Sequence, residues 1–299
     1  MEQEVKIING YKIKDETARK IKLEHYIIDN SITTEELQNL LNIERTKIIE
    51  FKNGTYQFDT TLKLNKNTTL ILNDSILNFS VTHGFFNFKS TDEFLNYEGN
   101  GNIKIVGGSI NGGISFIHAK NLYFENINFY HVLNDHVFEL CALKNVYIKN
   151  CTFEGIPTQT QDRNYVEYVQ IDDCTYSNFP HLNENNPTYD ETPNYNINIE
   201  NCIFKNSDSE DYDFYTAIGG HTYIENKIHK YINIINNEFY NSENTCIRLH
   251  NTENVIIDNN LYHVGASLKD LGKKCFAINK IEDKEYLEKI ISKFDKDVV

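Results

Sequence analysis

A nine-residue pattern of polar and apolar positions recurs along most of the chain. The order is polar, aliphatic, any residue, apolar, any residue, Asn/Gly/Asp, any two residues, apolar. Seven copies are present, and they begin at Thr69, Asn102, Asn121, Asn145, Asn196, Tyr231 and Asn254. The second and fourth positions alternate with polar neighbours, which is the period of a β-strand and not of an α-helix. Each copy therefore predicts one short strand.

Two further positions of the pattern predict the path of the chain after each strand. The sixth position holds residue types that tolerate a left-handed backbone, so it predicts a bend: Asp74, Gly107, Asn126, Asn150, Asn201, Asn236 and Asn259. The ninth position is always apolar at the same distance past the bend, so it predicts a stacked core column: Leu77, Ile110, Phe129, Phe153, Phe204, Phe239 and Tyr262.

Such a short unit cannot bury its apolar side chains alone, so the copies must stack on one another. The shortest intervals between copies indicate one coil of roughly 20–25 residues. We therefore predict an all-β fold, a single-stranded right-handed parallel β-helix over residues 46–265. An antiparallel sandwich would instead predict Asn-Gly or Asp-Gly hairpin turns between strands, and none joins consecutive copies.

The two ends of the chain lack the nine-residue pattern. Residues 1–45 predict a small α/β segment that caps the solenoid or attaches it to something else. Asp15 starts one short helix there, and Thr33 and Glu36 have capping-box spacing before another. Residues 266–299 predict a C-terminal capping segment with a helix, because apolar residues recur there at helical spacing: Tyr286, Leu287, Ile290, Ile291 and Phe294.

Composition narrows the function classes. The 299 residues include 29 basic and 43 acidic side chains, a formal net charge of −14, which disfavours nucleic acid or an anionic membrane as a partner. No apolar stretch has the length of a membrane span, and the first residues lack the apolar core of a signal peptide, so we expect a product made in the cytoplasm. The six cysteines lack CxxC spacing; we expect small residues of the solenoid wall rather than a disulfide framework.

A second strand of each coil carries the candidate chemistry. Aligning HVFELC, YVQIDD, AIGGHT and CIRLHN places four apolar residues inward: Phe138, Val169, Ile218 and Ile247. Alternation then puts two columns on one outer face: Glu139, Gln170, Gly219 and Arg248, followed by Cys141, Asp172, His221 and His250. Coil and strand spacings separate Glu139 from Asp172 by roughly 8 Å at the backbone, close to the acid and base of an inverting glycosidase.

From this face we predict four catalytic residues: Glu139, Asp172, Asp173 and His221. Predicted substrate-binding residues are Gln170, Arg248 and His250, with Tyr165 and Tyr215 from insertions beside them; His136 and Asp135 are further candidates. The glycines before His221 are expected to leave open space above Asp172. Arg248 offers a bidentate partner for an anionic sugar. No cofactor or metal is predicted, and a divalent metal at Asp172, Asp173 and His221 is kept as an alternative.

Parts of the sequence resemble known families. The IKDETAR segment resembles N-terminal segments of tail and baseplate-associated proteins from phages and prophages of low-GC Gram-positive bacteria. The opening turns NGTYQF and NTTLIL are similar to pectate-lyase-like β-helix proteins, tailspikes and appendages among them, and VQID, GGH and CIRLHN look like uncharacterised β-helix proteins of such phages. The resemblance implies attachment to a particle through residues 1–45 and a polymer-binding or polymer-degrading role.

A more distant resemblance concerns the site. Asn134-Asp135, Asp172-Asp173, Gly220-His221 and Arg248-Leu249-His250 stand in an order similar to the polygalacturonase family, which cleaves acidic polysaccharides with inversion. Arg248 matches that family's arginine within its strand. The Asp-Asp and Gly-His pairs follow their strands here, whereas in the family they precede them, and His250 stands where the family has lysine.

Together these features predict a tail-associated depolymerase that binds and hydrolyses a bacterial surface polysaccharide as a glycoside hydrolase. It would be virion-associated and act at the bacterial surface, with the tail or baseplate as partner. The alternatives are a non-catalytic receptor-binding tail protein, a polysaccharide lyase and a teichoic acid hydrolase on the same fold. Resemblance to tailspikes suggests a homotrimer, although no heptad repeat supports one.

Overall fold

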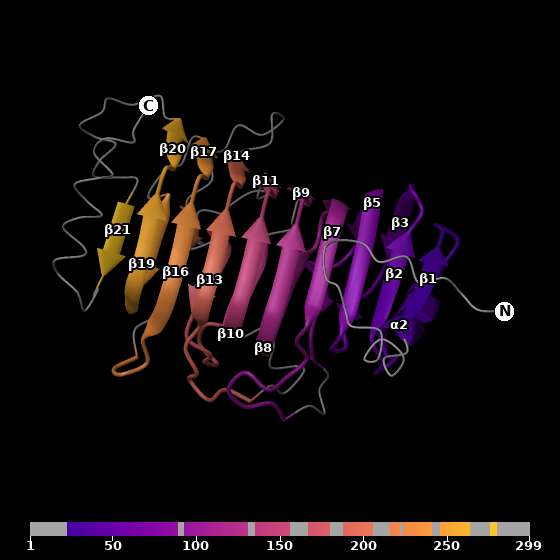
Figure 1. Ribbon diagram of the computed structural model, residues 1–299, viewed down its shortest axis with the longest axis horizontal. Coiled ribbons are helices and arrows are strands. Elements are labelled where there is room, and N and C mark those ends of the chain that lie inside the picture. Colours follow the sequence, from indigo (N-terminus) through magenta and orange to yellow (C-terminus); the bar gives the residue numbers. More distant parts are fainter. Residues whose placement is uncertain are drawn as a thin grey trace, which may run out of the picture.

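The computed structural model describes residues 23–88, 93–130, 135–155, 167–179, 188–205, 216–221, 224–240, 246–263 and 276–279. Within them, every strand pairing is parallel. The chain winds as a parallel β-helix whose coils follow one another from β1 to β21 (Figure 1). The predicted fold is confirmed at this level, and its right hand stays a prediction.

Three parallel sheets form the sides of the solenoid. Sheet 1 carries the strand predicted from the nine-residue pattern, and Figure 1 views the molecule from this side. It consists of β1 (Glu24–Ile28), β2 (Lys47–Phe51), the first parts of β5 (Thr68–Phe79) and β7 (Ile103–Ile110), the last parts of β8 (Gly113–Glu125) and β10 (Phe138–Lys149), then β13 (Tyr195–Glu200), β16 (His229–Ile235) and β19 (Thr252–Asp258).

Sheet 2 follows sheet 1 in every coil and carries the ninth position of the pattern. It consists of β3 (Thr55–Phe58), the last parts of β5 and β7, β9 (Asn128–Tyr130), β11 (Thr152–Glu154), β14 (Ile203–Lys205), β17 (Glu238–Tyr240) and β20 (Leu261–His263).

Sheet 3 closes each coil and carries the predicted site. It consists of β4 (Leu62–Lys63), β6 (His83–Phe86), the first parts of β8 and β10, β12 (Glu167–Asp172), β15 (Thr216–Gly219), β18 (Ile247–His250) and β21 (Phe276–Asn279).

Most coils bend at two asparagines. Asn126, Asn150 and Asn201 have φ of 58°, 53° and 55° at the predicted bend, where a left-handed residue with a short polar side chain costs least. In the first copy the positive φ belongs to Asn73 (51°), so the prediction of Asp74 there was wrong by one residue. The first position of the pattern is a second bend, which the sequence reading missed; it is left-handed at Asn102, Asn121, Asn145, Asn196, Tyr231 and Asn254.

The side chains of this second bend stack along the solenoid. The amide of Asn121 donates to Asn102 at 2.9 Å, and the amide of Asn145 donates to Asn121 at 3.0 Å. The ladder continues from Asn196 to Asn145 at 2.9 Å. Each rung satisfies a polar group of its neighbour, so the register of the coils is specified by hydrogen bonds as well as by the core.

The predicted core column is confirmed. Phe129, Phe153, Phe204, Phe239 and Tyr262 are buried, and successive ring centroids lie 5.3, 4.6, 5.0 and 5.2 Å apart. Parallel in-register coils place identical positions above one another, so each ring packs on the ring of the next coil.

The N-terminal end is covered by a helix. The helix α2 (Thr34–Leu41) starts at Thr33, which forms the predicted capping box with Glu36, and Leu37 and Leu41 join the core. The strand β1 lies before this helix yet pairs with β2, so part of the predicted segment 1–45 belongs to the coil ladder. The predicted helix at Asp15 and the C-terminal helix lie outside the described residues.

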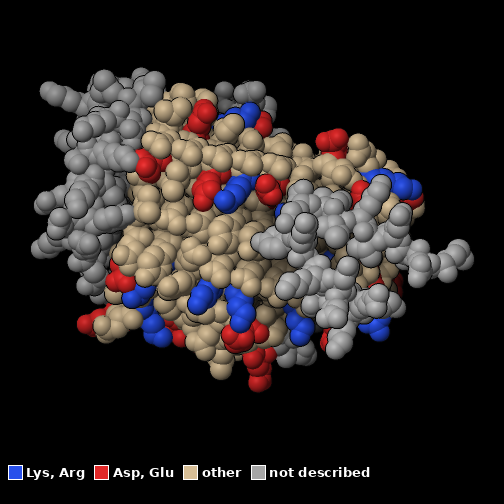
Figure 2. Space-filling view, in the orientation of Figure 1, with Lys and Arg blue, Asp and Glu red and all other residues tan. Residues whose placement is uncertain are grey.

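The face of sheet 1 carries charges of both signs (Figure 2). They are paired between adjacent coils, for example Lys149 with Glu200 at 2.8 Å and Lys104 with Glu125 at 3.5 Å. Among the described helices, none is long and apolar enough to cross a membrane.

Candidate functional site

The predicted alignment of the sheet 3 strands is confirmed. Phe138 pairs with Val169, Val169 with Ile218, and Ile218 with Ile247, and all four side chains are in the core. The same register places Glu139, Gln170, Gly219 and Arg248 in one row, with Cys141 beside Asp172. Residues from four coils thus meet on the outer side of sheet 3.

These groups face away from the core but are largely shielded from solvent. Glu139, Gln170 and Asp172 are 2%, 1% and 0% exposed. The side chains of His221 and Arg248 keep 22% and 13% of their exposure. The most accessible part of the site is therefore cationic, with carboxylates beneath it.

Glu167 joins this cluster, and the sequence reading missed it. Its neighbours Tyr168 and Val169 both point into the core, as do Ala217 and Ile218 in the next coil. Two successive core residues reset the alternation, so the side chain before them returns to the outer side. Strict alternation from Val169 would place Glu167 inward. The doubled apolar pair at the start of each of these strands was the available signal.

Glu167 is completely buried and is surrounded by basic groups. Its Oε2 lies 2.8 Å from Nε2 of His221 and 3.5 Å from Nδ1 of His136, and its Oε1 forms an ion pair with the guanidinium of Arg248. Burial by itself would raise the pKa of Glu167. The hydrogen bond from His221 and the charges of His136, His221 and Arg248 outweigh burial and hold the pKa below its usual range.

His221 connects Glu167 to Asp172. Its Nδ1 lies 3.2 Å from Oδ2 of Asp172, and its backbone N–H donates to both Asp172 oxygens at 3.1 and 3.0 Å. Burial alone would lower the pKa of His221, but the hydrogen bonds to Asp172 and Glu167 and their charges raise it to about 9. At neutral pH the imidazole therefore carries two N–H groups held between two carboxylates.

The glycines before His221 leave no open space above Asp172, contrary to expectation. A Cβ on Gly220 would lie 2.3 Å from the carbonyl oxygen of Ile171, and one on Gly219 would lie 3.1 Å from Cγ of Glu167. The missing side chains instead let the backbone of His221 and the side chain of Glu167 approach closely.

Glu139 lies in a neighbouring group rather than beside Asp172. It forms a hydrogen bond with the hydroxyl of Ser115 and lies 3.7 Å from Nδ1 of His83, whose Nε2 is 3.7 Å from Asp135. Gln170 stands between Glu139 and Asp172, because it pairs with Glu139 in register and its amide donates to Asp172 at 3.2 Å. Asp172 is therefore linked through the His221 imidazole to Glu167 and not to Glu139.

The remaining predicted residues have other surroundings. Asp173 lies 3.6 Å from Nε2 of the buried His229, and its backbone carbonyl accepts from Thr175 and Asn178. His250 has a pKa lowered by burial and by the charge of Arg248. Tyr165 and Tyr215 lie outside the described residues.

Metal binding can be judged from the groups of potential ligands. In the described part of the chain, three groups lie close enough together to hold an ion: His136, Glu167 and His221; Asp135, His136 and Glu139; and His118, Cys174 and Asp190. Asp172, Asp173 and His221 are not such a group there, so the metal alternative at those residues has no support.

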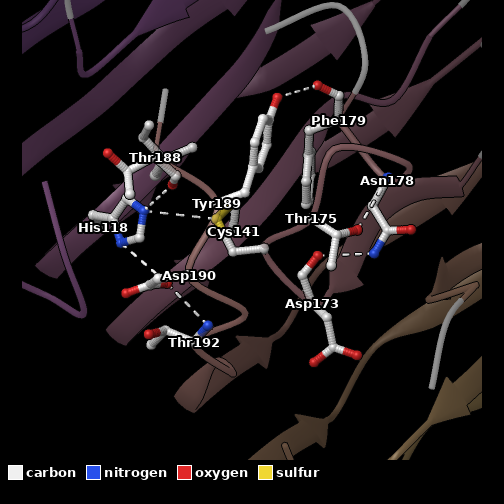
Figure 3. Close-up of a disulfide and its surroundings, with 12 residues drawn as sticks. His118, Cys141, Asp173, Thr175, Asn178, Phe179, Thr188, Tyr189, Asp190 and Thr192 are labelled. Carbon is white, nitrogen blue, oxygen red and sulfur yellow. Dashed lines mark hydrogen bonds and ion pairs between the residues drawn. A yellow bond between two sulfur atoms is a disulfide. The ribbon is translucent and has the colours of Figure 1, made fainter. Parts of the chain in front are cut away.

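A disulfide joins two coils beside the site (Figure 3). Cys141 and Cys174 are bonded, which corrects the expectation that these cysteines are only small wall residues. Cys151, Cys202 and Cys246 are buried residues of the solenoid wall, as predicted. Around the disulfide lies a second apolar cluster outside sheet 3, which includes Phe86, Phe88, Ile117 and Phe179. The segment after Asp172 is thereby held against the solenoid.

Comparison with known proteins supports the fold. The chain is 28% identical over 176 residues to the plasmin and fibronectin-binding protein A of Streptococcus pneumoniae, a match that covers 56% of this chain and 23% of that protein. Two solved structures of the pneumococcal surface adhesin PfbA match with TM-scores of 0.68 and 0.66 at 21% identity, covering 78% and 77% of this chain and 60% and 62% of theirs. The chain therefore spans only about a quarter of the curated relative and less than two thirds of the solved structures.

A candidate glycosyl hydrolase from Parabacteroides merdae matches with a TM-score of 0.45 and 12% identity, covering 86% of this chain and all of that one. A likeness at that level carries no argument about activity. No family profile matches the chain. What the comparisons establish is a parallel β-helix like that of a streptococcal surface adhesin.

Proposed function

We propose that the chain binds a bacterial surface polysaccharide along the outer side of sheet 3 and hydrolyses it there. The observation that carries this proposal is the buried cluster in which His221 links Glu167 to Asp172 and Arg248 pairs with Glu167. Glu167 and Asp172 are fully buried, which is costly for charged groups, and apolar residues in their place would stabilise the fold equally well or better. Ionisable clusters with displaced pKa values are characteristic of functional sites.

The residues divide into proton-transfer and binding roles. His221, protonated at neutral pH, would turn the N–H that faces Asp172 at 3.2 Å to the leaving glycosidic oxygen and protonate it as the C–O bond breaks, while Glu167 stabilises the charged imidazole. Glu139, with His83 and Asp135 beside it, accepts the proton of the attacking water, whose hydroxyl forms the new bond to carbon. Glu139 gains one proton from water, and His221 loses one to the leaving group. Proton exchange with solvent then returns both side chains to their starting protonation states.

Arg248 and His250 would bind an anionic substituent of the glycan, which competes with Glu167 for the guanidinium. Gln170 would bind hydroxyl groups between the two carboxylate groups. Asp173 acts through the backbone in this scheme, since its carbonyl orders the turn that follows Asp172. Tyr165 and Tyr215 stay proposed as aromatic contacts to sugar rings.

The proposal also covers where the protein is attached and where it acts. Residues 1–45 join the protein to a phage or prophage tail or baseplate, so it would act from the virion at the bacterial surface as a right-handed coil of the tailspike kind, with a homotrimer as the expected assembly. The IKDETAR segment supports this attachment by its resemblance to tail proteins.

A second candidate is an adhesin without catalysis. It is favoured by the similarity to a protein named for binding plasmin and fibronectin and to a surface adhesin of the same fold. In that case the outer side of sheet 3 recognises a surface ligand without breaking a bond.

The test is release of reducing ends from purified capsular and cell-wall glycans of low-GC Gram-positive bacteria. Wild type is compared with Asp172→Asn, Glu167→Gln and Glu139→Gln, and with Glu200→Gln as a matched control on sheet 1, far along the coil from the cluster. Release that persists in the control and is lost in all three site variants supports hydrolysis. Binding of a glycan without release of reducing ends from any of them would favour the adhesin.

A further inference from the structure

Two stretches that follow β12 lie against the outer side of sheet 3, next to the site. They are residues 173–179 and 188–194, here called the cover. Phe179 and Tyr189 pack on the second apolar cluster outside the core, and the hydroxyl of Tyr189 donates to the carbonyl oxygen of Phe179 at 2.8 Å (Figure 3). The two stretches therefore form one unit on the side of the solenoid.

The first stretch of the cover carries one end of the disulfide. Its turn is ordered locally, because the Asn178 side chain donates to the carbonyl oxygen of Asp173 at 2.8 Å and the Phe179 N–H donates to that of Thr175 at 3.3 Å. Cys174, in the same turn, is bonded to Cys141 of the preceding coil. The disulfide is thus a covalent tie between the cover and sheet 3.

The same tie reaches the candidate site through Asp172. Cys141 pairs in register with Asp172, and Cys174 lies two residues further along the chain. The carbonyl oxygen of Asp172 accepts from the side chain of Asn194, in the second stretch of the cover, at 3.0 Å. The carboxylate of Asp172 accepts from the backbone N–H of His221. Asp172 therefore lies between the cover and His221, and movement of the cover changes where its carboxylate is held.

Burial makes the bond depend on the position of the cover. Cys141 and Cys174 are both 0% exposed, so a soluble thiol or disulfide reaches the sulfur atoms only while the cover is open. The bond closes a loop between residues 33 apart in sequence, and such a loop restricts the open ensemble more than the closed state. The closed cover is therefore more populated in the oxidised chain than in the reduced chain.

We propose that the Cys141–Cys174 disulfide is a redox-sensitive link that holds the cover on sheet 3 and Asp172 beside His221, and that reduction releases both. Disulfides persist in oxidising surroundings and are reduced in the cytoplasm, so the complete arrangement would form only in oxidising surroundings. This link is independent of the proposed hydrolysis.

The covalent step is a thiol–disulfide exchange with a small-molecule disulfide as oxidant. The thiolate of one cysteine attacks a sulfur of the oxidant and expels one thiolate. The second cysteine attacks the resulting mixed disulfide and expels the other thiolate, so the S–S bond of the oxidant breaks as the bond between Cys141 and Cys174 forms. The two protons of the cysteine thiols pass to the two expelled thiolates. A small-molecule dithiol reverses these steps.

The experiment is hydrogen–deuterium exchange of the full chain, oxidised and phosphine-reduced, with the state of the two cysteines checked by alkylation and mass. The peptides that report are those containing the Glu191 amide, which donates to the carbonyl oxygen of Cys174 at 3.2 Å, and the His221 amide, which donates to Asp172. Both are expected to exchange about 10–100-fold faster after reduction. A peptide from β2, far along the solenoid, is expected to keep its rate.

Two variants control for the reductant itself. The double variant Cys141→Ser, Cys174→Ser should exchange as the reduced wild type does, with and without phosphine. Cys202→Ser, at a buried cysteine of the solenoid wall, should respond to phosphine as the wild type does. Where the double variant does not fold, as checked by far-ultraviolet circular dichroism, the oxidised and reduced wild type decide the matter.

The proposal is overturned if the Glu191 peptide exchanges at the same rate in both redox states. It is also overturned if the Glu191 peptide accelerates and the His221 peptide does not, because Asp172 would then be positioned without the disulfide. Equal acceleration of the β2 peptide would overturn it too, since the disulfide would then stabilise the whole chain rather than the cover. None of these measurements needs a glycan, so a failure of the proposed hydrolysis is seen separately.

Discussion

Replacing Glu167 by glutamine tests whether the buried cluster is held together by charge. The side chain keeps its size and one acceptor oxygen but loses its negative charge. Arg248 and His221 then lose the carboxylate that neutralises them, 2.8 Å away in the case of His221. His136, with Nδ1 at 3.5 Å, loses the same partner.

The magnitude follows from burial. Glu167 is 0% exposed, and the side chains facing it keep 9–22% of their exposure. Removing one partner of a buried ion pair leaves the other charge uncompensated and costs about 3–5 kcal/mol. Deprotonation of His221 relieves part of this, so we expect a loss near the lower end, about 3 kcal/mol.

The assay is urea unfolding at about pH 7, followed by far-ultraviolet circular dichroism, with the midpoint compared at unchanged slope. Glu200→Gln is the matched control. It removes a carboxylate paired with Lys149 at 2.8 Å, but both side chains are partly exposed, at 38% for Lys149 and 26% for Glu200, so the expected loss is below about 1 kcal/mol. A double-mutant cycle with Arg248→Gln should give a coupling of about 1–3 kcal/mol.

Equal losses in Glu167→Gln and Glu200→Gln would refute this reasoning. So would a coupling energy near zero in the cycle with Arg248, because the pair would then contribute no more than two separate polar groups.

Three further outcomes are expected. The stability contributed by His221, whose pKa is raised to about 9, is present below about pH 6.5 and is lost as pH rises to about 9; that contributed by neutral His229, whose burial lowers its pKa to about 4, is present above about pH 6.5 and is lost as pH falls to about 4. The free energy of unfolding, measured with urea across pH, should therefore fall on both the acid and the alkaline side, by at most about 3 kcal/mol each. His221→Gln should flatten the alkaline side only, and His229→Gln the acid side only. Asn126, at φ 58°, should lose about 1–2 kcal/mol on change to Ala and far less on change to Gly; equal thermal shifts would count against the left-handed bend. Phe153→Ala should cost about 3–5 kcal/mol in urea unfolding, because its ring packs against Phe129 and Phe204; a loss under about 1 kcal/mol would be inconsistent with a continuous stack.

Features that repeat from coil to coil were predictable from the sequence. The column from Phe129 to Tyr262 and the bends at Asn126, Asn150 and Asn201 recur at fixed offsets, and a parallel solenoid stacks equal offsets directly. The register of Glu139 with Gln170 followed from the same reasoning. Local periodicity and the stacking of coils determine these features together. The core positions and bends of one coil therefore predict those of the next.

Departures from the repeat could be decided only by the tertiary structure. Glu167 lies in the site because two successive residues, Tyr168 and Val169, both point into the core at a corner. The inward and outward alternation is interrupted there, so the Glu167 side chain faces outward. Cys141 forms a disulfide with Cys174 because the chain returns to the same corner after a full coil. That His221 links Asp172 to Glu167 rather than to Glu139 depends on side-chain directions across three coils. Sequence determined which residues share a face; the packing at the corners determined which of them touch.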